Sequence, residues 1–194
     1  AKLALLGGFR KKAVICAMKV LIVAATDGEI GSLPELPGRR DKITLLITGV
    51  GMVATTYALT RHLQKNKYDL VLQVGVAGSF NPNIPLGSVV FITADQFADL
   101  GAEDHDKYLD IFEMGLAGRN SAPYTNGSLL TPLLPVHEKI MLPKIKGITV
   151  NTVSGNEPTI RKRAEKYGAD VESMEGAAFH LVCLQDNIPF AQVR

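Results

Sequence analysis

The stretch best suited to chemistry lies near the end of the chain, where two carboxylates stand three residues apart. Glu172 and Glu175 are followed by the small residues Gly176, Ala177 and Ala178, and then by an apolar run. Small residues allow close packing, so we expect a helix to begin here and to press against its neighbour. A carboxylate at such a place either caps the helix through backbone N–H groups or reaches into a site. The residues alone leave both alternatives open.

A third acid, Glu29, follows a short apolar run at residues 19–25 that is typical of a buried parallel strand. In open α/β sheets, ligands bind at the carboxyl ends of the strands. Small and polar residues are predicted at four such ends, in the stretches 26–29, 49–52, 75–79 and 154–157. The pair Gly49 and Gly51 is equally compatible with plain turn chemistry. It lacks the third glycine of a dinucleotide fingerprint, and the chain has no phosphate-loop Gly-Lys-Ser/Thr.

Hydrophobic patterning predicts strands that alternate with helices, which is typical of an α/β fold with a mostly parallel or mixed sheet. Strands are predicted at residues 19–25, 43–48, 69–76, 88–93, 148–153 and 189–193. Helices are predicted from Met52, from residue 157 to Gly168, and from Glu175 to about Gln185, with a short helix at 135–141. The segment 95–135 shows little periodicity, and long loops in compact domains are often functional.

Composition limits the class of protein and of partner. The 194 residues suffice for one domain, and a net charge of +2 with two short basic runs does not suggest nucleic-acid binding. No stretch reaches the ~18 apolar residues of a membrane span. The two cysteines, Cys16 and Cys183, form no disulfide framework and fit a reducing cytoplasm. Residues 1–17 are interpreted as a leader or extension, and residues 18–194 as the domain.

An acidic cluster could suggest a metal site, but its spacing does not match a two-metal centre. The cluster contains Asp95, Asp99, Glu103, Asp104, Asp106 and Asp110, together with His105. A solvated loop is the favoured interpretation, so we predict no metal and no cofactor. Asn156 and Glu157 likewise have two interpretations, as caps of the helix that follows or as part of a site.

The stretch Ser173-Met174-Glu175-Gly176-Ala177-Ala178 resembles the ribose-binding motif of the nucleoside phosphorylase and nucleosidase superfamily. The resemblance extends from Met18 to Arg194 and implies a single-domain three-layer sandwich with a mixed, mostly parallel central sheet. Within the superfamily, three further stretches are similar to the futalosine hydrolases rather than to the methylthioadenosine/S-adenosylhomocysteine nucleosidases; these are residues 49–55, 97–104 and 154–157. The resemblance therefore implies hydrolysis of futalosine to release hypoxanthine, in a route to menaquinone.

The resemblance also implies roles for individual residues. Glu29 corresponds to the acid that activates the attacking water, and Glu175 to the acid that binds the ribose hydroxyls, while Met174 would pack on the sugar. The full set implied to contact substrate is Gly51, Ala77, Gly78, Asn156, Met174 and Glu175. The family implies a homodimer or larger homo-oligomer and a small nucleoside as the partner.

Hydrolysis can be separated from phosphorolysis by the charges expected near the sugar. A phosphorylase must hold a phosphate dianion with Arg, Lys or hydroxyl donors. Where the hexameric bacterial phosphorylases carry Arg and Ser, this chain has Gln73 and Val76. Glu29 would repel phosphate but can accept a proton from water, so the residues favour hydrolysis.

Two alternatives to a futalosine hydrolase remain open from the sequence. One is a methylthioadenosine/S-adenosylhomocysteine nucleosidase, and the other is a catalytically impaired nucleoside-binding protein. In the family, the group that handles the leaving purine lies on a loop just after the strand that contains Arg194, where this sequence ends. The C-terminal part is therefore expected to be missing, and the base specificity stays open.

Overall fold

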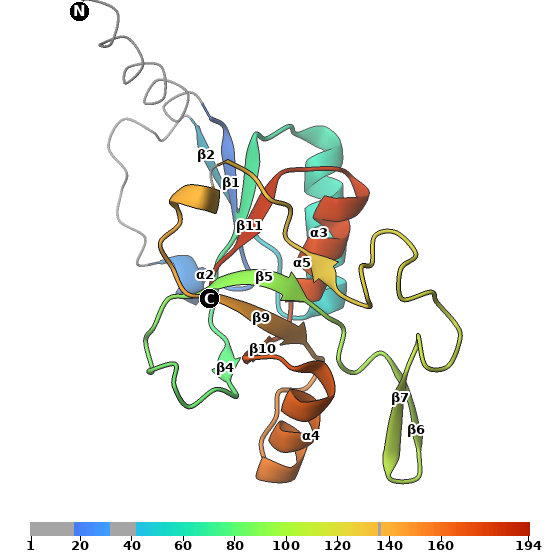
Figure 1. Ribbon diagram of the computed structural model, residues 1–194. Helices are drawn as coiled ribbons and strands as arrows, with labels where there is room; N and C mark the ends of the chain where they lie inside the picture. The colour runs from blue at the N-terminus through green and yellow to red at the C-terminus, as the bar shows by residue number, and fades with distance from the viewer. Residues whose placement is uncertain (1–17, 32–41, 136) are drawn as a thin grey trace, which may run out of the picture.

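The computed structural model describes residues 18–31, 42–135 and 137–194 (Figure 1). The expected leader at residues 1–17 lies outside the described residues. Among the described helices, none is long and apolar enough to cross a membrane.

One sheet is wholly parallel and carries most of the strand ends of interest. Its order is β11-β3-β1-β2, with β1 at Val20–Ala24, β2 at Ile43–Ile47, β3 at Leu70–Gln73 and β11 at Phe190–Gln192. The registers pair Val20 with both Ile43 and Leu70, and Phe190 with Val71. Because all four strands run the same way, the residues that follow them emerge at one edge of the sheet.

A second sheet is mixed and continues from the first. Its order is β4-β10-β9-β5-β8, with β4 at Gly78–Ser79, β10 at Val171–Ser173, β9 at Lys144–Thr149, β5 at Phe91–Asp95 and β8 at Leu129–Leu130. The strands β10, β9 and β5 pair in parallel, while β4 and β8 pair antiparallel at the two edges. An isolated bridge between Phe91 and Val193 connects the two sheets. The predicted α/β class with a mixed, mostly parallel sheet is confirmed.

Two helices cover one face of the parallel sheet and form the largest core. Helix α3 spans Met52–Lys65 and helix α5 spans Gly176–Gln185, and the two lie side by side (Figure 1). The buried cluster between helices and sheet contains Leu21, Val71 and Phe190 from the strands, Leu59 and Leu63 from α3, and Phe179 from α5. The opposite face of β1 packs Ile22 and Ala24 against Ile30 of the short helix α2, at Asp27–Ile30.

Helix α4 spans Glu157–Tyr167 and follows the sequence signals closely. The Asn156 side chain accepts a hydrogen bond from the Thr159 N–H at 3.0 Å, and Gly168 ends the helix in the left-handed conformation at φ 57°. Since this φ favours glycine, the predicted helix end has a physical basis. A hairpin of β6 at Gly101–Asp104 and β7 at Lys107–Asp110 projects near α4 (Figure 1).

Three sequence predictions need correction. The strand predicted at 148–153 lies at Lys144–Thr149, where exposed Lys144 and Lys146 alternate with buried residues. Glu172 belongs to strand β10 rather than to a helix start, because residues 171–173 pair with both β9 and β4. The segment 95–135 contains the β6–β7 hairpin, whose mostly polar residues show no apolar alternation.

The core assignment predicts unequal effects for two alanine substitutions on α3. Leu59 is 0% exposed, whereas Gln64 on the same helix is exposed. Leu59→Ala removes buried methyl groups and leaves a cavity, so we expect it to lower the free energy of unfolding by about 2–5 kcal/mol. Gln64→Ala should change it by less than about 0.5 kcal/mol. Urea unfolding followed by circular dichroism measures both, and equal losses would contradict this packing.

Candidate active site

A buried guanidinium lies at the edge of the sheet where the parallel strands end. Arg194 lies two residues after Gln192, the end of β11, and its side chain is only 2% exposed. Its Nη2 lies 3.8 Å from Oε2 of Glu175 and donates a hydrogen bond to Oγ of Ser173 at 3.3 Å. Burial lowers the pKa of this guanidinium, while the carboxylates of Glu175, Asp95 and Glu29 raise it. Arg194 is therefore a buried cation that faces three acids.

Glu29 is fixed by the backbone around the end of β1. Its Oε2 accepts hydrogen bonds from the N–H groups of Ala25 at 2.9 Å and Thr26 at 3.0 Å. Its Oε1 accepts from the N–H of Val76 at 3.3 Å, in the loop after β3. Charge-assisted bonds of this kind hold a carboxylate in one orientation. Glu29 thus connects the ends of β1 and β3.

Gly75 explains why Glu29 and Arg194 can approach each other. A Cβ atom at Gly75 would lie 2.7 Å from Oε1 of Glu29 and would collide with Nη1 of Arg194. Both charged groups therefore occupy the space beside this glycine. A side chain at residue 75 would have to displace one of them.

Glu175 reaches into the site and does not cap its helix. It stands at the N-cap position of α5, but it makes no side-chain capping bond there. Instead its Oε1 accepts a hydrogen bond from the N–H of Gly51 at 3.0 Å, at the start of α3. Gly51 has a φ of 92°, which glycine adopts without strain. Of the two alternatives left open by the sequence, capping of α5 is therefore wrong, and a role of Glu175 in a site stays a prediction.

The two predicted catalytic carboxylates share one partner. Glu175 pairs with Nη2 of Arg194, and Glu29 lies beside Nη1. This meeting point is formed by residues that follow β1, β3, β10 and β11, together with the turn after β2. Glu29, Gly78 and Glu175 are predicted to converge at one edge of the sheet. The contacts above agree for Glu29 and Glu175, whereas Gly78 pairs with Glu172 on β10.

The other predicted substrate contacts occupy different surroundings. Met174 is half-buried between β10 and Glu175, and exposed Gly78 pairs with Glu172 on the neighbouring strand. Ala77 packs against the buried cluster that includes Val90 and Val171. Asn156 caps α4, so its side chain already has a structural role. Met174 therefore lies next to Glu175 in the chain, Gly78 lies beside Glu172 in the sheet, and the Asn156 side chain bonds the start of α4.

Glu172, the first acid of the motif, holds a loop in place. Its carboxylate accepts hydrogen bonds from the N–H and Oγ of Ser154 at 2.7 and 2.9 Å. Arg163 of α4 donates to the same carboxylate at 3.2 Å, to Oγ of Ser154 at 2.8 Å and to the carbonyl of Thr152 at 2.9 Å. Glu172 is 4% exposed, so this buried pair fixes the loop between β9 and α4.

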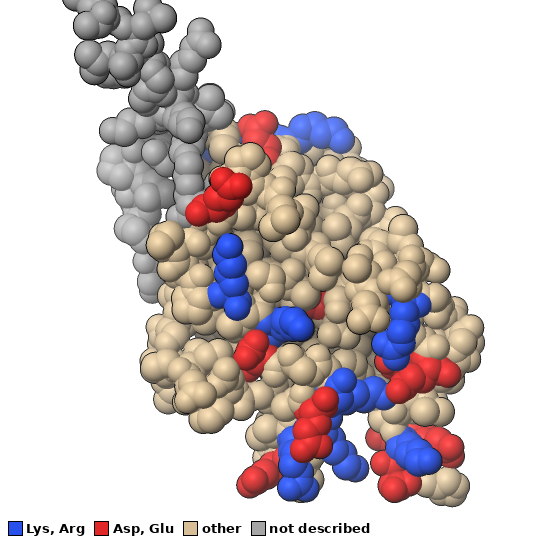
Figure 2. Space-filling view, in the orientation of Figure 1, with Lys and Arg blue, Asp and Glu red and all other residues tan. Residues whose placement is uncertain are grey.

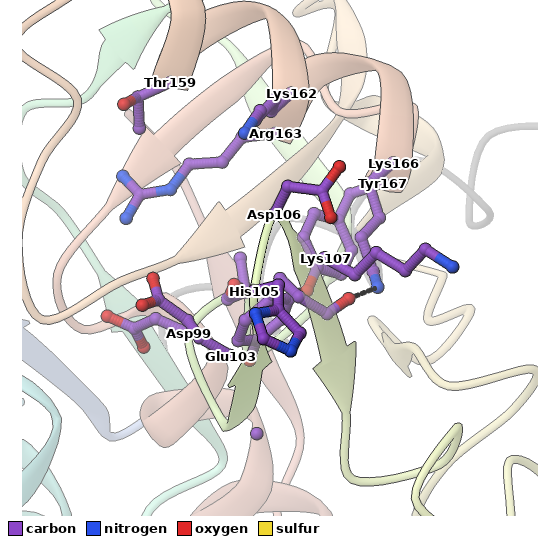
Figure 3. A pocket seen from close by; sticks show the side chains of 13 residues that line it. Asp99, Glu103, His105, Asp106, Lys107, Thr159, Lys162, Arg163, Lys166 and Tyr167 are labelled. Atoms are coloured by element: carbon purple, nitrogen blue, oxygen red, sulfur yellow. Dashed lines mark hydrogen bonds between the residues drawn. The ribbon is translucent and has the colours of Figure 1, made fainter.

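A cavity of about 630 Å³ lies away from the carboxylates, between α4 and the β6–β7 hairpin (Figure 3). Figure 2 shows basic and acidic side chains gathered on this part of the surface. The charged residues that line the cavity are Asp99, Glu103, Asp106, Lys107, Lys162, Arg163 and Lys166. Neither Glu29 nor Glu175 lines it. Because buried charges of opposite sign converge at Glu175 and Arg194, these carboxylates remain the candidate site.

The acidic cluster divides into buried and exposed members. Glu103, Asp104 and Asp106 are exposed, as predicted for a solvated loop, whereas Asp95 and Asp110 are buried. Asp110 pairs with Arg119 at 3.0 Å. Within the described ranges, no group of three or more His, Cys, Asp or Glu side chains is arranged to hold a metal ion.

The sequence interpretation missed Arg194 and Asp95 as members of this site. Arg194 is a lone charged residue two positions after the end of the buried strand β11, and Asp95 is the last residue of β5. A charge at the carboxyl end of a buried strand is the signal that points to such residues.

Comparison with known proteins identifies the family of the chain. Residues 24–194 match the model of the phosphorylase superfamily. The chain is 30% identical to a futalosine hydrolase from Thermus thermophilus over 151 residues, which cover 77% of this chain and 66% of that protein. It is also 30% identical to a futalosine hydrolase from Streptomyces coelicolor over 172 residues, which cover 84% of this chain and 68% of the relative. The chain thus spans about two thirds of the length of these relatives.

Among solved structures, the fold is similar to a 5'-methylthioadenosine/S-adenosylhomocysteine nucleosidase from Neisseria meningitidis in complex with methylthio-immucillin-A. The TM-score is 0.72, the identity is 18%, and the match covers 90% of this chain and 83% of that one. At this identity the likeness concerns the fold. The family model and the two relatives together show that the chain belongs to the phosphorylase superfamily, and they confirm the resemblance to futalosine hydrolases that its motifs predict.

Proposed function

We propose that this chain is an N-ribosyl hydrolase that cleaves the purine–ribose bond of futalosine and releases hypoxanthine in the cytoplasm. The observation that supports the chemistry most strongly is the meeting of Glu29 and Glu175 at Arg194. The similarity to two futalosine hydrolases supports the choice of substrate. Glu29 and Glu175 act as catalytic residues, and Gly51, Gly78 and Met174 border the sugar.

In this mechanism Glu29 acts as the general base. Its carboxylate is held by three backbone N–H groups, from Ala25, Thr26 and Val76. A water that donates a proton to Glu29 is oriented for attack on the anomeric carbon. The nearby Arg194 guanidinium stabilises the hydroxide character that develops on this water.

Glu175 binds the ribose hydroxyls and stabilises positive charge on the sugar. As the carbon–nitrogen bond stretches, the ribose acquires oxocarbenium character, as in glycoside hydrolysis. Glu175 is 5% exposed, and in such a water-poor site its negative charge acts strongly on the transition state. The bond from the Gly51 N–H keeps one oxygen oriented before substrate arrives.

Arg194 is a cation that could attract phosphate to the site. The sequence interpretation considered Gln73, Val76 and Glu29, whereas Arg194 adds a positive charge just beyond the end of β11. Its charge is shared by Glu175, Asp95 and Glu29, so little remains to bind a dianion. The Gln73 side chain is only 2% exposed, so its amide is not accessible to phosphate. The Val76 side chain is 78% exposed but apolar, so it has no donor to offer. Hydrolysis remains the favoured reaction.

The alternative substrate is methylthioadenosine or S-adenosylhomocysteine, which the similar structure from Neisseria meningitidis suggests through its name and ligand. The 18% identity of that structure supports the fold, whereas the two relatives at 30% identity favour futalosine. We expect the complete gene product to release hypoxanthine from futalosine faster than it releases adenine from methylthioadenosine. Chromatography of the released base decides, and adenine release alone would favour the alternative.

We also propose a homodimer or larger homo-oligomer. Large apolar side chains are exposed around the start of α3, with Val50 at 55%, Val53 at 82% and Tyr57 at 62%. Exposed apolar side chains grouped in this way are typical of protein–protein contacts. Light scattering during size-exclusion chromatography measures the mass, and a monomer at micromolar concentration would contradict the proposal.

Glu175→Gln tests the electrostatic role of this carboxylate. The amide keeps the shape but removes the charge, so we expect kcat for futalosine to fall by about 10²- to 10³-fold. Initial rates of hypoxanthine release measure the change. Glu157→Gln is the matched control, because Glu157 is an exposed acid in the first turn of α4. Turnover of Glu175→Gln near that of the control would remove Glu175 from the mechanism.

We expect the enzyme to turn over at the same rate with and without millimolar phosphate. We also expect it to release free ribose product rather than a ribose 1-phosphate. The physical reason is that Glu29 repels a dianion while the charge of Arg194 is already compensated. Phosphorus NMR of the reaction mixture identifies the product. A sugar-phosphate signal that grows with phosphate concentration would show that the enzyme is a phosphorylase.

A further inference from the structure

Asp95 is a buried acid that the proposed mechanism does not use. It ends strand β5, is 1% exposed, and has two hydrogen-bond partners in different elements. Its Oδ1 accepts from Oγ1 of Thr149 on β9 at 2.8 Å, and its Oδ2 accepts from Nε2 of Gln192 on β11 at 3.3 Å.

Both hydrogen-bond partners of Asp95 are connected to the segments that carry Glu175 and Arg194. The Thr149 hydroxyl accepts a hydrogen bond from the N–H of Ala177 at 2.7 Å, and Ala177 is two residues beyond Glu175 at the start of α5. Gln192 is the last residue of β11 and lies two residues before Arg194. The Asp95 carboxylate is therefore bonded directly to β11, which precedes Arg194, and is connected through Thr149 to α5, which follows Glu175.

The small residues of the motif make room for this carboxylate. A Cβ atom at Gly176 would collide with Oδ2 of Asp95 and would lie 2.5 Å from Nε2 of Gln192. A Cβ atom at Gly147 would lie 3.1 Å from the same Oδ2. The close helix packing expected from the sequence is thus an approach of α5 to Asp95.

The charges around Asp95 favour its ionised form at neutral pH. The positive charge of Arg194, which follows β11, attracts the Asp95 carboxylate. The N-terminus of α5 adds the positive end of a helix dipole. Burial raises the pKa of Asp95 to about 6, while the bonds from Thr149 and Gln192 and the charge of Arg194 oppose that rise. Of the other groups on α5, His180 is neutral, because burial lowers its pKa to about 4, and Glu175 shares Arg194. Strands β9 and β8 contribute Thr149 and Leu129, which do not titrate.

We propose that Asp95 is a positioning residue whose ionised carboxylate holds the head of α5 and the end of β11 together, so that Glu175 and Arg194 meet in the catalytic geometry. The proposal rests on the hydrolase function proposed above. Asp95 acts through Thr149, Gln192 and Arg194, and it does not touch the substrate.

Asp95→Asn tests the charge with little change in shape. We expect kcat for futalosine at pH 7.5 to fall roughly tenfold to a hundredfold, as for a small misplacement of reacting groups, with KM changed much less. In the wild type, kcat should rise as pH increases through about 6, where Asp95 loses its proton. That rise should be absent in Asp95→Asn. A variant with the wild-type rate and the wild-type pH profile would overturn the proposal.

Two further variants separate positioning from a general loss of packing. Thr149→Val removes the hydroxyl between Asp95 and Ala177 and should lower kcat, whereas Thr149→Ser keeps the hydroxyl and should restore most of it. Asp110→Asn is the matched control, because Asp110 is also a buried acid beside an arginine. Asp110→Asn should leave the pH profile of kcat unchanged. If Asp110→Asn also lost the rise of kcat with pH, the role of Asp95 would be contradicted.

A measurement without substrate distinguishes this proposal from the proposed function. In a crystal structure of Asp95→Asn, the separation of Glu175 Oε2 and Arg194 Nη2 should increase beyond 3.8 Å. If the wild type hydrolyses no nucleoside, the proposed function fails, and this separation still tests the positioning. An ion pair unchanged in length and orientation would overturn the role of Asp95.

Discussion

The active-site architecture depends on one buried positive charge. Arg194 is removed from water, and an isolated buried guanidinium is too costly to persist without compensation. Its partners come from three separate parts of the chain, at Glu29, Asp95 and Glu175. The requirement to compensate this charge therefore brings the carboxyl ends of β1, β5 and β11 and the head of α5 to one place.

The glycines around this charge follow from the same constraint. Gly75 leaves space for Glu29 and Arg194, and Gly176 leaves space for Asp95 and Gln192. Gly51 adopts a positive φ and presents its N–H to Glu175. In the sequence, Gly51 is compatible with turn chemistry or a substrate contact, Gly75 stands in a predicted ligand stretch, and Gly176 is a small packing residue of the motif. In the structure each one permits a close approach between the backbone and a charged or polar side chain.

The sequence predicted the elements with strong periodicity and the acids that lie within motifs. Helices α3, α4 and α5 and strands β1, β2 and β11 lie close to their predicted places, and Glu29 and Glu175 both lie near Arg194. Strand β10 was missed because three residues are too few to show a period, and its pairing with β9 and β4 is set by tertiary contacts. Arg194 and Asp95 were missed because only the fold brings residues 29, 95, 175 and 194 together.

A crystal structure with a bound non-hydrolysable nucleoside tests the assignment of the site most directly. The protein offers two places for such a ligand, the carboxylates around Arg194 and the cavity between α4 and the β6–β7 hairpin. We expect the ribose hydroxyls within hydrogen-bonding distance of Glu175, with the anomeric carbon facing Glu29. A nucleoside held only in the α4 cavity, with Glu29 and Glu175 facing no ligand, would contradict the site described here.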